Sequence, residues 1–263
     1  MEAGKIRKVI ALLTDFGAGS CFVGIMKGVI RGICPCEVID LSHTVSPGNI
    51  EEAAFILKKS HQFFPRNTVF VVVVDPGVGT ERRIISAEKD GRTFIAPDNG
   101  VLSWIISDKE PAYEVSEEAF FIKPVSRTFH GRDIFAPCAA LICRGLPLSL
   151  LGRRVKNIKK IPPPVVKSEK NRIIGEIILK DTFGNLITSI EEENLKGKAV
   201  RKIVIEDCGI EIQGLSSSFE EAKGKPLGAV IDSFGNLEIF AYLRPASSII
   251  KDWYKKKVTV ELE

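Results

Sequence analysis

The stretch TVFVVVVDPGVGT occupies residues 68–80. After Thr68 its residues are apolar without alternation, which is typical of a parallel strand covered by helices on both faces. Asp75, Pro76 and two glycines follow at once, and these residue types end a strand and form a tight turn. The stretch therefore predicts a central strand over residues 68–74 that places the carboxylate of Asp75 at the edge of a sheet.

Short apolar runs and helix-like segments alternate around this central strand. The helix-like segments carry apolar residues at helical spacing. Asp133 is the predicted N-cap of the last of them, with Pro137 in its first turns. Such alternation predicts an α/β fold with a mostly parallel sheet sandwiched by helices. The predicted strands are residues 9–14, 37–42, 68–74 and 92–96, and the predicted helices are residues 21–33, 49–64 and 133–143.

Polar or glycine-rich turns follow each predicted strand of this first half. In parallel sheets the carboxyl ends of the strands share one edge, and ligands bind there. We therefore expect the four turns to face the same side and to hold a site. The turns are residues 14–17 (TDFG), 42–43 (SH), 75–80 (DPGVGT) and 97–100 (PDNG).

The pattern changes after a basic stretch, residues 153–160, and the three prolines at 162–164, which together indicate a solvated linker. Short strands separated by turn residues then predict a small antiparallel β-barrel or sandwich. The sequence DTFGNL at 181–186 is echoed by DSFGNL at 232–237, which favours two similar hairpins. We expect an α/β domain over residues 1–160 and a β-barrel domain over residues 170–263.

Composition bounds the class of protein. The chain has 263 residues, a net charge of +4 and 44% hydrophobic residues, so it can form a sizeable core but lacks the strong basic excess of a nucleic-acid binder. No apolar run reaches membrane-spanning length, and no signal peptide is recognisable at the start. The six cysteines form no C-x-x-C pair, and no H-E-x-x-H or EF-hand pattern occurs. We therefore expect a soluble cytoplasmic protein with no metal, no nucleic-acid partner and no membrane partner.

Three residue types could carry chemistry at the predicted edge. Asp75 is either a rigid catalytic carboxylate or a cap of its own turn. One of Arg82 and Arg83 could pair with Asp75, or both could be surface residues. His130 stands before a helix and is either a proton carrier or a structural loop residue. No Walker loop, G-x-G-x-x-G or G-x-S-x-G motif occurs, so an Asp, Arg and His acting on water or a proton is the hypothesis that remains.

Several motifs occur in a fixed order along the chain. They are TDFG at 14–17, VGIMKG at 23–28, DLSH at 40–43, VDPGVGT at 74–80, Arg82-Arg83, APDNG at 96–100 and TFHGRDIFAP at 128–137. Together they resemble the S-adenosylmethionine hydrolase family, also called S-adenosyl-L-methionine hydroxide adenosyltransferases, which is related to fluorinases and chlorinases. The resemblance covers nearly the whole chain. The sequence departs from the family pattern in two places: Ser20 stands where relatives usually have Asp, and Pro245-Ala246 stands where they have Asn-Ala.

The resemblance implies cleavage of S-adenosylmethionine by water into adenosine and L-methionine, with attack on the ribose 5′ carbon. It implies that Asp75, Arg82 and His130 bind and activate the water and that Asp15 binds the ribose hydroxyls. The implied reaction needs no organic cofactor. It also implies a homotrimer with sites between the first domain of one subunit and the second domain of a neighbour. Further substrate contacts implied by the resemblance are Phe16, Asp181, Phe183, Asn185, Ser233, Glu238 and Ala246.

Two other functions stay open at this point. Halide transfer to the same carbon would use the same scaffold, although polar water-handling groups suit hydroxide better than a desolvated halide. A nucleoside-binding protein without turnover would also fit, because the departures from the family pattern at Ser20 and Pro245-Ala246 leave room for it.

Overall fold

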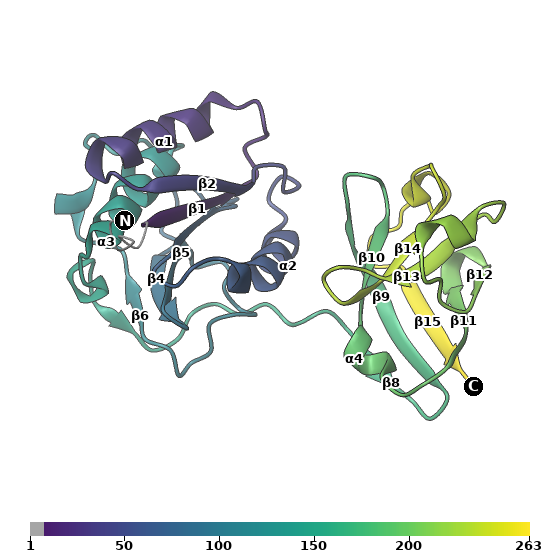
Figure 1. Cartoon of the computed structure of the whole chain (residues 1–263). Coiled ribbons are helices and arrows are strands. Elements are labelled where there is room, and N and C mark those ends of the chain that lie inside the picture. The colour runs from purple at the N-terminus through teal and green to yellow at the C-terminus, as the bar shows by residue number, and fades with distance from the viewer. Residues whose placement is uncertain (1–7) are drawn as a thin grey trace, which may run out of the picture. The chain divides into compact units, whose positions relative to one another are not determined.

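The computed structural model describes residues 8–263, and the chain divides into two units between Pro162 and Pro163 (Figure 1). The first unit is a mixed α/β structure, and the second is an antiparallel, nearly barrel-shaped sheet. The predicted fold class is therefore confirmed. None of the helices within residues 8–263 has the length and apolar character needed to cross a membrane.

The first unit is built on one sheet with the strand order β2-β1-β3-β5-β4-β6-β7. Strands β2, β1, β3 and β5 are mutually parallel, whereas β4, β6 and β7 continue the sheet with antiparallel pairing. The strands are β1 (Val9–Thr14), β2 (Glu37–Ser42), β3 (Val69–Val73), β4 (Ile84–Lys89), β5 (Arg92–Pro97), β6 (Ala112–Glu114) and β7 (Arg154–Val155).

Side chains of the central strands alternate between two cores, one on each face of the sheet. In β3, Val69 and Val71 belong to the core that contains helices α1 (Cys21–Ile33) and α3 (Ala136–Arg144). Phe70 and Val72 belong to the core that contains α2 (Ile50–Ser60). Figure 1 shows α1 and α3 on one side of the sheet and α2 on the other. The uninterrupted apolar run of β3 is explained by this burial on both faces.

Two helix boundaries differ from the sequence-based expectation. The predicted helix over residues 49–64 ends as a 3-10 turn, His61–Phe63, after α2. Asp133 does not cap the last helix, because it lies inside a π-helical turn, Gly131–Phe135, that leads into α3. Its carboxylate accepts hydrogen bonds from Ser126 N (2.8 Å) and Arg132 Nε (2.6 Å) instead of from the first main-chain N–H groups of the helix.

The antiparallel part of the first sheet is not predicted by the sequence pattern. Strand β4 directly follows the turn after β3, and it inserts next to β5 rather than next to β3. Strands β6 and β7 are short, which leaves too few residues for a clear alternation of apolar and polar side chains.

The second unit is a sheet with the order β12-β11-β15-β9-β10-β14-β13, in which every pairing is antiparallel. Its interior is a core of aliphatic side chains, and a short helix, α4 (Glu192–Leu195), follows β10. The strands are β8 (Lys167–Ser168), which pairs with β9, β9 (Arg172–Lys180), β10 (Leu186–Glu191), β11 (Val200–Ile205), β12 (Ile210–Gln213), β13 (Gly228–Ile231), β14 (Asn236–Phe240) and β15 (Lys257–Leu262).

The repeated DxFGN sequence forms two hairpin loops of the same design. Asp181 Oδ1 accepts hydrogen bonds from the main-chain N–H groups of Phe183 (2.9 Å) and Asn185 (2.8 Å). Asp232 Oδ1 accepts the same pair of bonds two and four residues further along the chain, each at 2.8 Å. The first loop joins β9 to β10 and the second joins β13 to β14. Because β10 pairs with β14, the two loops belong to neighbouring hairpins.

Candidate active site

The carboxyl ends of the parallel strands meet at one edge of the first sheet, as the sequence predicts. Main-chain and side-chain hydrogen bonds join the turns that follow these strands. Gly17 N donates to His43 O (2.7 Å), and Asn99 Nδ2 donates to Val74 O (2.9 Å). Asp15 lies in the same region, where its Oδ2 accepts a hydrogen bond from Gly48 N (2.9 Å).

Asp75, Arg82 and His130 form one connected set at this edge. Arg82 Nε donates to Asp75 Oδ2 (2.9 Å), and Arg82 Nη2 donates to the same oxygen (2.5 Å). The Nη2 group also contacts His130 Nδ1 at 2.7 Å. The side chains of Asp75 and Arg82 are 4% and 8% exposed, so this is a buried ion pair rather than a surface contact. The structure thus brings the three predicted residues together around a single guanidinium.

The contact with Arg82 fixes the protonation of the His130 ring. A guanidinium has no acceptor, so Nδ1 of His130 must accept the hydrogen bond and the ring proton of the neutral form lies on Nε2. Burial and the positive charge of Arg82 lower the pKa of His130, while Asp75 and Asp133 act in the opposite direction. His130 is therefore neutral at pH 7.

Arg83 has a different partner from its neighbour. Its Nη2 donates to Asp98 Oδ2 (2.5 Å) and to Asn157 O (3.0 Å), so it links the turn after β5 to the residues that follow β7. Of the two arginines, Arg82 is the one that pairs with Asp75. The centroid of the Phe135 ring lies 5.8 Å from the Arg82 guanidinium carbon, a cation–π contact that the sequence pattern does not predict.

The loop between Asp75 and Arg82 depends on Gly79. This residue has φ +79°, and a Cβ at this position would lie 2.3 Å from the carbonyl oxygen of Arg127. A side chain is therefore excluded both by backbone conformation and by space. The close approach connects the Asp75 loop to the segment that carries His130, three residues after Arg127.

An aromatic cluster lies next to these loops. Phe16, a predicted substrate contact, packs edge-on against Phe22 and Phe129, with ring centroids 5.9 Å and 6.1 Å away. Phe22 is half exposed although it is apolar, and Phe129 directly precedes His130. Neither was singled out by sequence reasoning. Ser20 caps α1 by accepting a hydrogen bond from Phe22 N (3.3 Å), which gives this departure from the family pattern a structural role.

The second unit contains a cavity of about 970 Å³ formed around the two DxFGN loops. Its size suits a ligand of nucleoside dimensions. The predicted residues that line it are Asp181, Phe183, Asn185, Ser233 and Glu238, and they are joined by Phe219, Asp232, Phe234, Tyr242, Leu243 and Pro245, among others. Five of the predicted substrate contacts are thus brought together by the structure.

Ala246 does not line this cavity. It is fully buried in the core of the second unit, behind Pro245, where it begins a 3-10 turn. None of its atoms is exposed within one chain, so it offers no contact to a ligand in this cavity. Gly184 approaches the same segment closely, because Ser247 N donates to Gly184 O (2.9 Å).

Three carboxylates and one guanidinium, that of Arg244, line the cavity, so the acidic groups outnumber the basic one. Glu238 lies on β14 and is buried, and Asp181 and Asp232 stand near it. Burial, followed by the charges of these two carboxylates, raises the pKa of Glu238 to about 7. The cavity can therefore hold a cation, whose charge would favour the ionised form of Glu238.

These features define a two-unit protein in which an α/β unit carries a buried Asp–Arg–His set and a β unit carries an acidic cavity. The family model of the SAM hydroxide adenosyltransferase N-terminal domain matches residues 10–152, and the model of the C-terminal domain of the same family matches residues 175–259. The chain therefore belongs to the SAM hydroxide adenosyltransferase family, and the resemblance drawn from the motifs is confirmed.

Named relatives agree with this assignment. The chain is 33% identical over 272 residues to the (R)-S-adenosyl-L-methionine hydrolase of Methanocaldococcus jannaschii, covering 97% of this chain and 96% of that protein. The enzyme of the same name from Thermus thermophilus is 32% identical, with coverage of 88% and 90%. A fluorinase from Actinopolyspora mzabensis is 29% identical, with coverage of 84% and 86%.

A solved structure also shares the fold along most of the chain. The crystal structure of an uncharacterized conserved protein from Thermotoga maritima superimposes with a TM-score of 0.85 at 35% identity, covering 95% of this chain and 99% of that one.

Proposed function

We propose that this chain hydrolyses S-adenosyl-L-methionine to adenosine and L-methionine. The observation that carries the proposal is the contact of one buried guanidinium with both Asp75 and His130, in a chain of this family. Relatives named (R)-S-adenosyl-L-methionine hydrolase, at 32% to 36% identity, support the substrate and the reaction.

The reaction needs no general acid, but it needs an activated nucleophile. The sulfonium of the substrate leaves as a neutral thioether, so its departure needs no proton. Water has a pKa of about 15.7 and must be polarised before it attacks the ribose 5′ carbon. The new carbon–oxygen bond forms as the carbon–sulfur bond breaks. The sulfur takes the electron pair and one proton of the water is released.

Asp75, Arg82 and His130 have different roles in activating the water. Arg82 stabilises a hydroxide-like oxygen by its charge, and it holds the Asp75 carboxylate in place. Asp75 is the group that can draw the proton of the water, whereas His130, whose Nδ1 accepts from Arg82, can donate its Nε2–H to the water oxygen. Positioning the oxygen in line with the carbon–sulfur bond supplies much of the remaining rate enhancement. We propose that no metal ion or organic cofactor takes part in this step.

The second unit is proposed to hold the remainder of the substrate. Its acidic cavity suits a positively charged ligand, and S-adenosylmethionine carries a sulfonium and an ammonium group. We assign Asp181, Phe183, Asn185, Ser233 and Glu238 to these contacts, and Asp15 and Phe16 of the first unit to the ribose side.

We further propose a homotrimer whose sites lie between the first unit of one subunit and the second unit of its neighbour. Apolar side chains around the cavity support this arrangement, because Phe183 is 78% exposed and Leu243 is 88% exposed within one chain. Such exposed apolar groups mark an interaction surface. All six cysteines are free thiols, which supports a reducing compartment, and we propose the cytoplasm.

The proposal is tested by incubating purified protein with S-adenosyl-L-methionine and separating the products by chromatography and mass spectrometry. Adenosine and methionine in equal amounts are expected. Parallel reactions in chloride and fluoride buffers distinguish halide transfer, which would yield a 5′-halogenated nucleoside. Tight binding of adenosine without any product would indicate a nucleoside-binding protein instead, and would contradict the proposal.

A further inference from the structure

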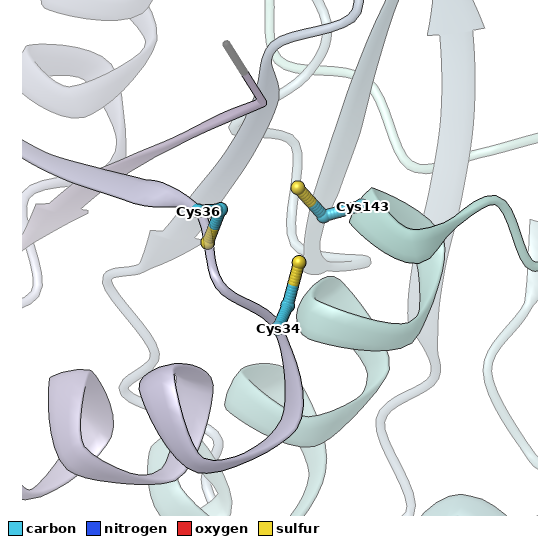
Figure 2. A group of neighbouring side chains, drawn as sticks. All are labelled: Cys34, Cys36 and Cys143. Carbon is cyan, nitrogen blue, oxygen red and sulfur yellow. The ribbon is translucent and has the colours of Figure 1, made fainter.

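Three cysteines from distant parts of the sequence converge in the first unit. Cys34 and Cys36 lie in the loop that joins α1 to β2, and Cys143 lies in the last turn of α3. Their three sulfur atoms lie within 4.8 Å of one another. Figure 2 shows the three side chains gathered between this loop and the end of the helix. Their exposures are 1%, 3% and 7%, so the group is enclosed by the protein.

The dimensions of the group match those of a thiolate metal centre. A zinc–sulfur bond of about 2.3 Å places the sulfurs of a tetrahedral or trigonal site about 3.8–4.0 Å apart. Sulfur atoms within 4.8 Å of one another therefore need to move by no more than about 1 Å to bind the same ion. Soft thiolate ligands select thiophilic cations such as zinc over magnesium or calcium.

The loop that carries two of the sulfurs is already held in position by other contacts. Cys34 N donates to Ile30 O (2.8 Å), and Cys36 N donates to Cys34 O (2.9 Å). Arg31 Nη1 donates to Cys36 O at 2.5 Å. A loop fixed in this way brings its ligands to the ion without a large ordering cost, and the nearby guanidinium favours a centre with net negative charge.

We propose that Cys34, Cys36 and Cys143 form a binding site for one zinc ion. Three thiolates supply the protein ligands, and the fourth position of the tetrahedron is left to a small exogenous ligand such as water. Burial, followed by the charge of Cys34, raises the pKa of Cys36, and burial raises the pKa of Cys143. Zinc binding would therefore displace the protons of these two thiols.

A disulfide between two of these cysteines is the alternative to a zinc site, but it does not account for the third. A disulfide joins two cysteines and would leave the third thiol of the group unused. All three sulfurs are unbonded in the structure, and each lies within reach of the other two. One zinc ion bound by all three thiolates accounts for the whole group.

The site is separate from the proposed active site. Cys36 directly precedes β2, so the group lies at the amino-terminal edge of the parallel strands, whereas Asp75 follows β3 at the carboxyl edge. A zinc ion here would tie the α1–β2 loop to the end of α3 across a long stretch of sequence. Its expected effect is on the stability of the first unit, because a link that closes a long loop restricts the unfolded chain. Hydrolysis of S-adenosylmethionine does not depend on it.

The test uses the full-length protein, stripped with a chelator and then titrated with Zn²⁺ or Co²⁺. Wild type is expected to bind one zinc ion per chain, measured by elemental analysis after gel filtration. Co²⁺ is expected to give a thiolate-to-metal charge-transfer band that saturates at one equivalent and is lost when Zn²⁺ is added. Zinc is also expected to raise the thermal midpoint of the stripped protein.

Matched alanine variants locate the ion. Cys143→Ala and Cys36→Ala are expected to lose zinc, the cobalt band and the zinc-dependent rise in thermal midpoint. Cys138→Ala removes another fully buried cysteine of α3 and should retain all three. Circular dichroism checks that each variant is folded. If a variant does not fold, the cobalt spectrum of wild type still shows whether thiolates bind the ion.

Three results would overturn the zinc site. One is a wild-type protein that binds well below one zinc ion per chain after titration. Another is a cobalt spectrum without a thiolate band, and the third is a Cys143→Ala variant that behaves like wild type. Turnover of S-adenosylmethionine is measured separately, so failure of the zinc site and failure of the proposed function are distinguishable.

Discussion

Nη2 of Arg82 lies 2.7 Å from Nδ1 of His130 while the same nitrogen donates to Asp75. The carboxylate and the imidazole of the site are therefore joined through one cation. Loss of the guanidinium, or protonation of His130, should disturb this arrangement, and this dependence is the basis of the first two predictions.

Replacing Arg82 by Lys is expected to lower kcat about 10²- to 10³-fold, the cost of losing a group that stabilises developing negative charge. Lysine keeps the charge, but it cannot donate from two nitrogens to Asp75 and contact His130 at the same time. Steady-state kinetics with S-adenosylmethionine measures the effect. Arg83→Lys is the matched control, since Arg83 pairs with Asp98 instead, and it should retain kcat within a few-fold. Equal losses in both variants would show that general damage to the loop is responsible.

The pH dependence of kcat is expected to have an acid limb set by His130. Its pKa is lowered by burial and by Arg82, so the limb should lie below the ordinary histidine value of about 6.5. Protonation places a hydrogen on Nδ1 and sets two cations against each other, which breaks the contact. His130→Gln should be slower and should lack this limb. A limb that is unchanged in His130→Gln belongs to another group.

The same pKa shift makes a prediction about stability. The folded protein binds a proton on His130 less readily than the unfolded chain does. The free energy of unfolding should therefore fall as pH drops below about 6.5, through the lowered pKa of the folded state. Denaturant melts of wild type and His130→Gln at several pH values measure this difference. If wild type and His130→Gln lose the same free energy of unfolding as the pH drops below about 6.5, the prediction is contradicted.

Glu238 should make substrate binding depend on pH near 7, where its raised pKa lies. Above that pH its carboxylate is charged and attracts the cationic substrate, so KM should decrease as pH rises through 7. Glu238→Gln should have a KM that is nearly constant over this range. Isothermal titration at pH 6 and pH 8 with a non-hydrolysed substrate analogue checks the binding step directly.

Glu238 is also expected to lower stability at high pH. Its folded pKa of about 7 is above the ordinary value of 4.5, so stability is lost as pH rises from the lower value to the higher. The loss is at most about 3 kcal/mol, and less where solvent in the open cavity screens the charge. At pH 8, Glu238→Gln should therefore unfold at a higher denaturant concentration than wild type. An equal or lower midpoint would show that burial of this carboxylate costs little.

Gly79→Ala should destabilise the protein by at least about 1–3 kcal/mol and lower kcat. Its Cβ would collide with Arg127 O, and its backbone conformation disfavours a side chain. Thermal melts and kinetics measure both effects. Gly28→Ala is the control, because this exposed helical position has open space, and the substitution should be neutral or stabilise by up to about 1 kcal/mol.

The sequence predicts those parts of the fold that depend on local patterns. The apolar run of β3 and the helical spacing of residues 21–33 predict their elements closely. Burial on both faces leaves an uninterrupted apolar run, and burial of one helix face leaves a helical period. The antiparallel strands β4 and β6 leave no such trace. The sequence of β4, IISAEK, neither alternates nor forms a long apolar run, and β6 has only three residues.

The candidate site is predictable in its residues but not in its connections. Strand ends and glycine turns point to Asp75 and His130, but the choice of Arg82 over Arg83 depends on where each side chain lies in the folded loop. The same limit applies to Asp133, whose carboxylate is taken by Ser126 and Arg132 instead of capping a helix. The cysteine group has no C-x-x-C pair, and its third member comes from a distant helix, so tertiary structure alone reveals it.

The central claim is that the Asp75, Arg82 and His130 set directs water to the ribose 5′ carbon. It is tested most directly by turnover of S-adenosyl-L-methionine in H₂¹⁸O, with mass spectrometry of the nucleoside product and with Asp75→Ala and His130→Ala measured alongside wild type. We expect adenosine with one ¹⁸O atom on its 5′ position from wild type, and a loss of at least about 10²-fold in rate for each variant. Unlabelled adenosine, a halogenated nucleoside, or variants that turn over like wild type would contradict the claim.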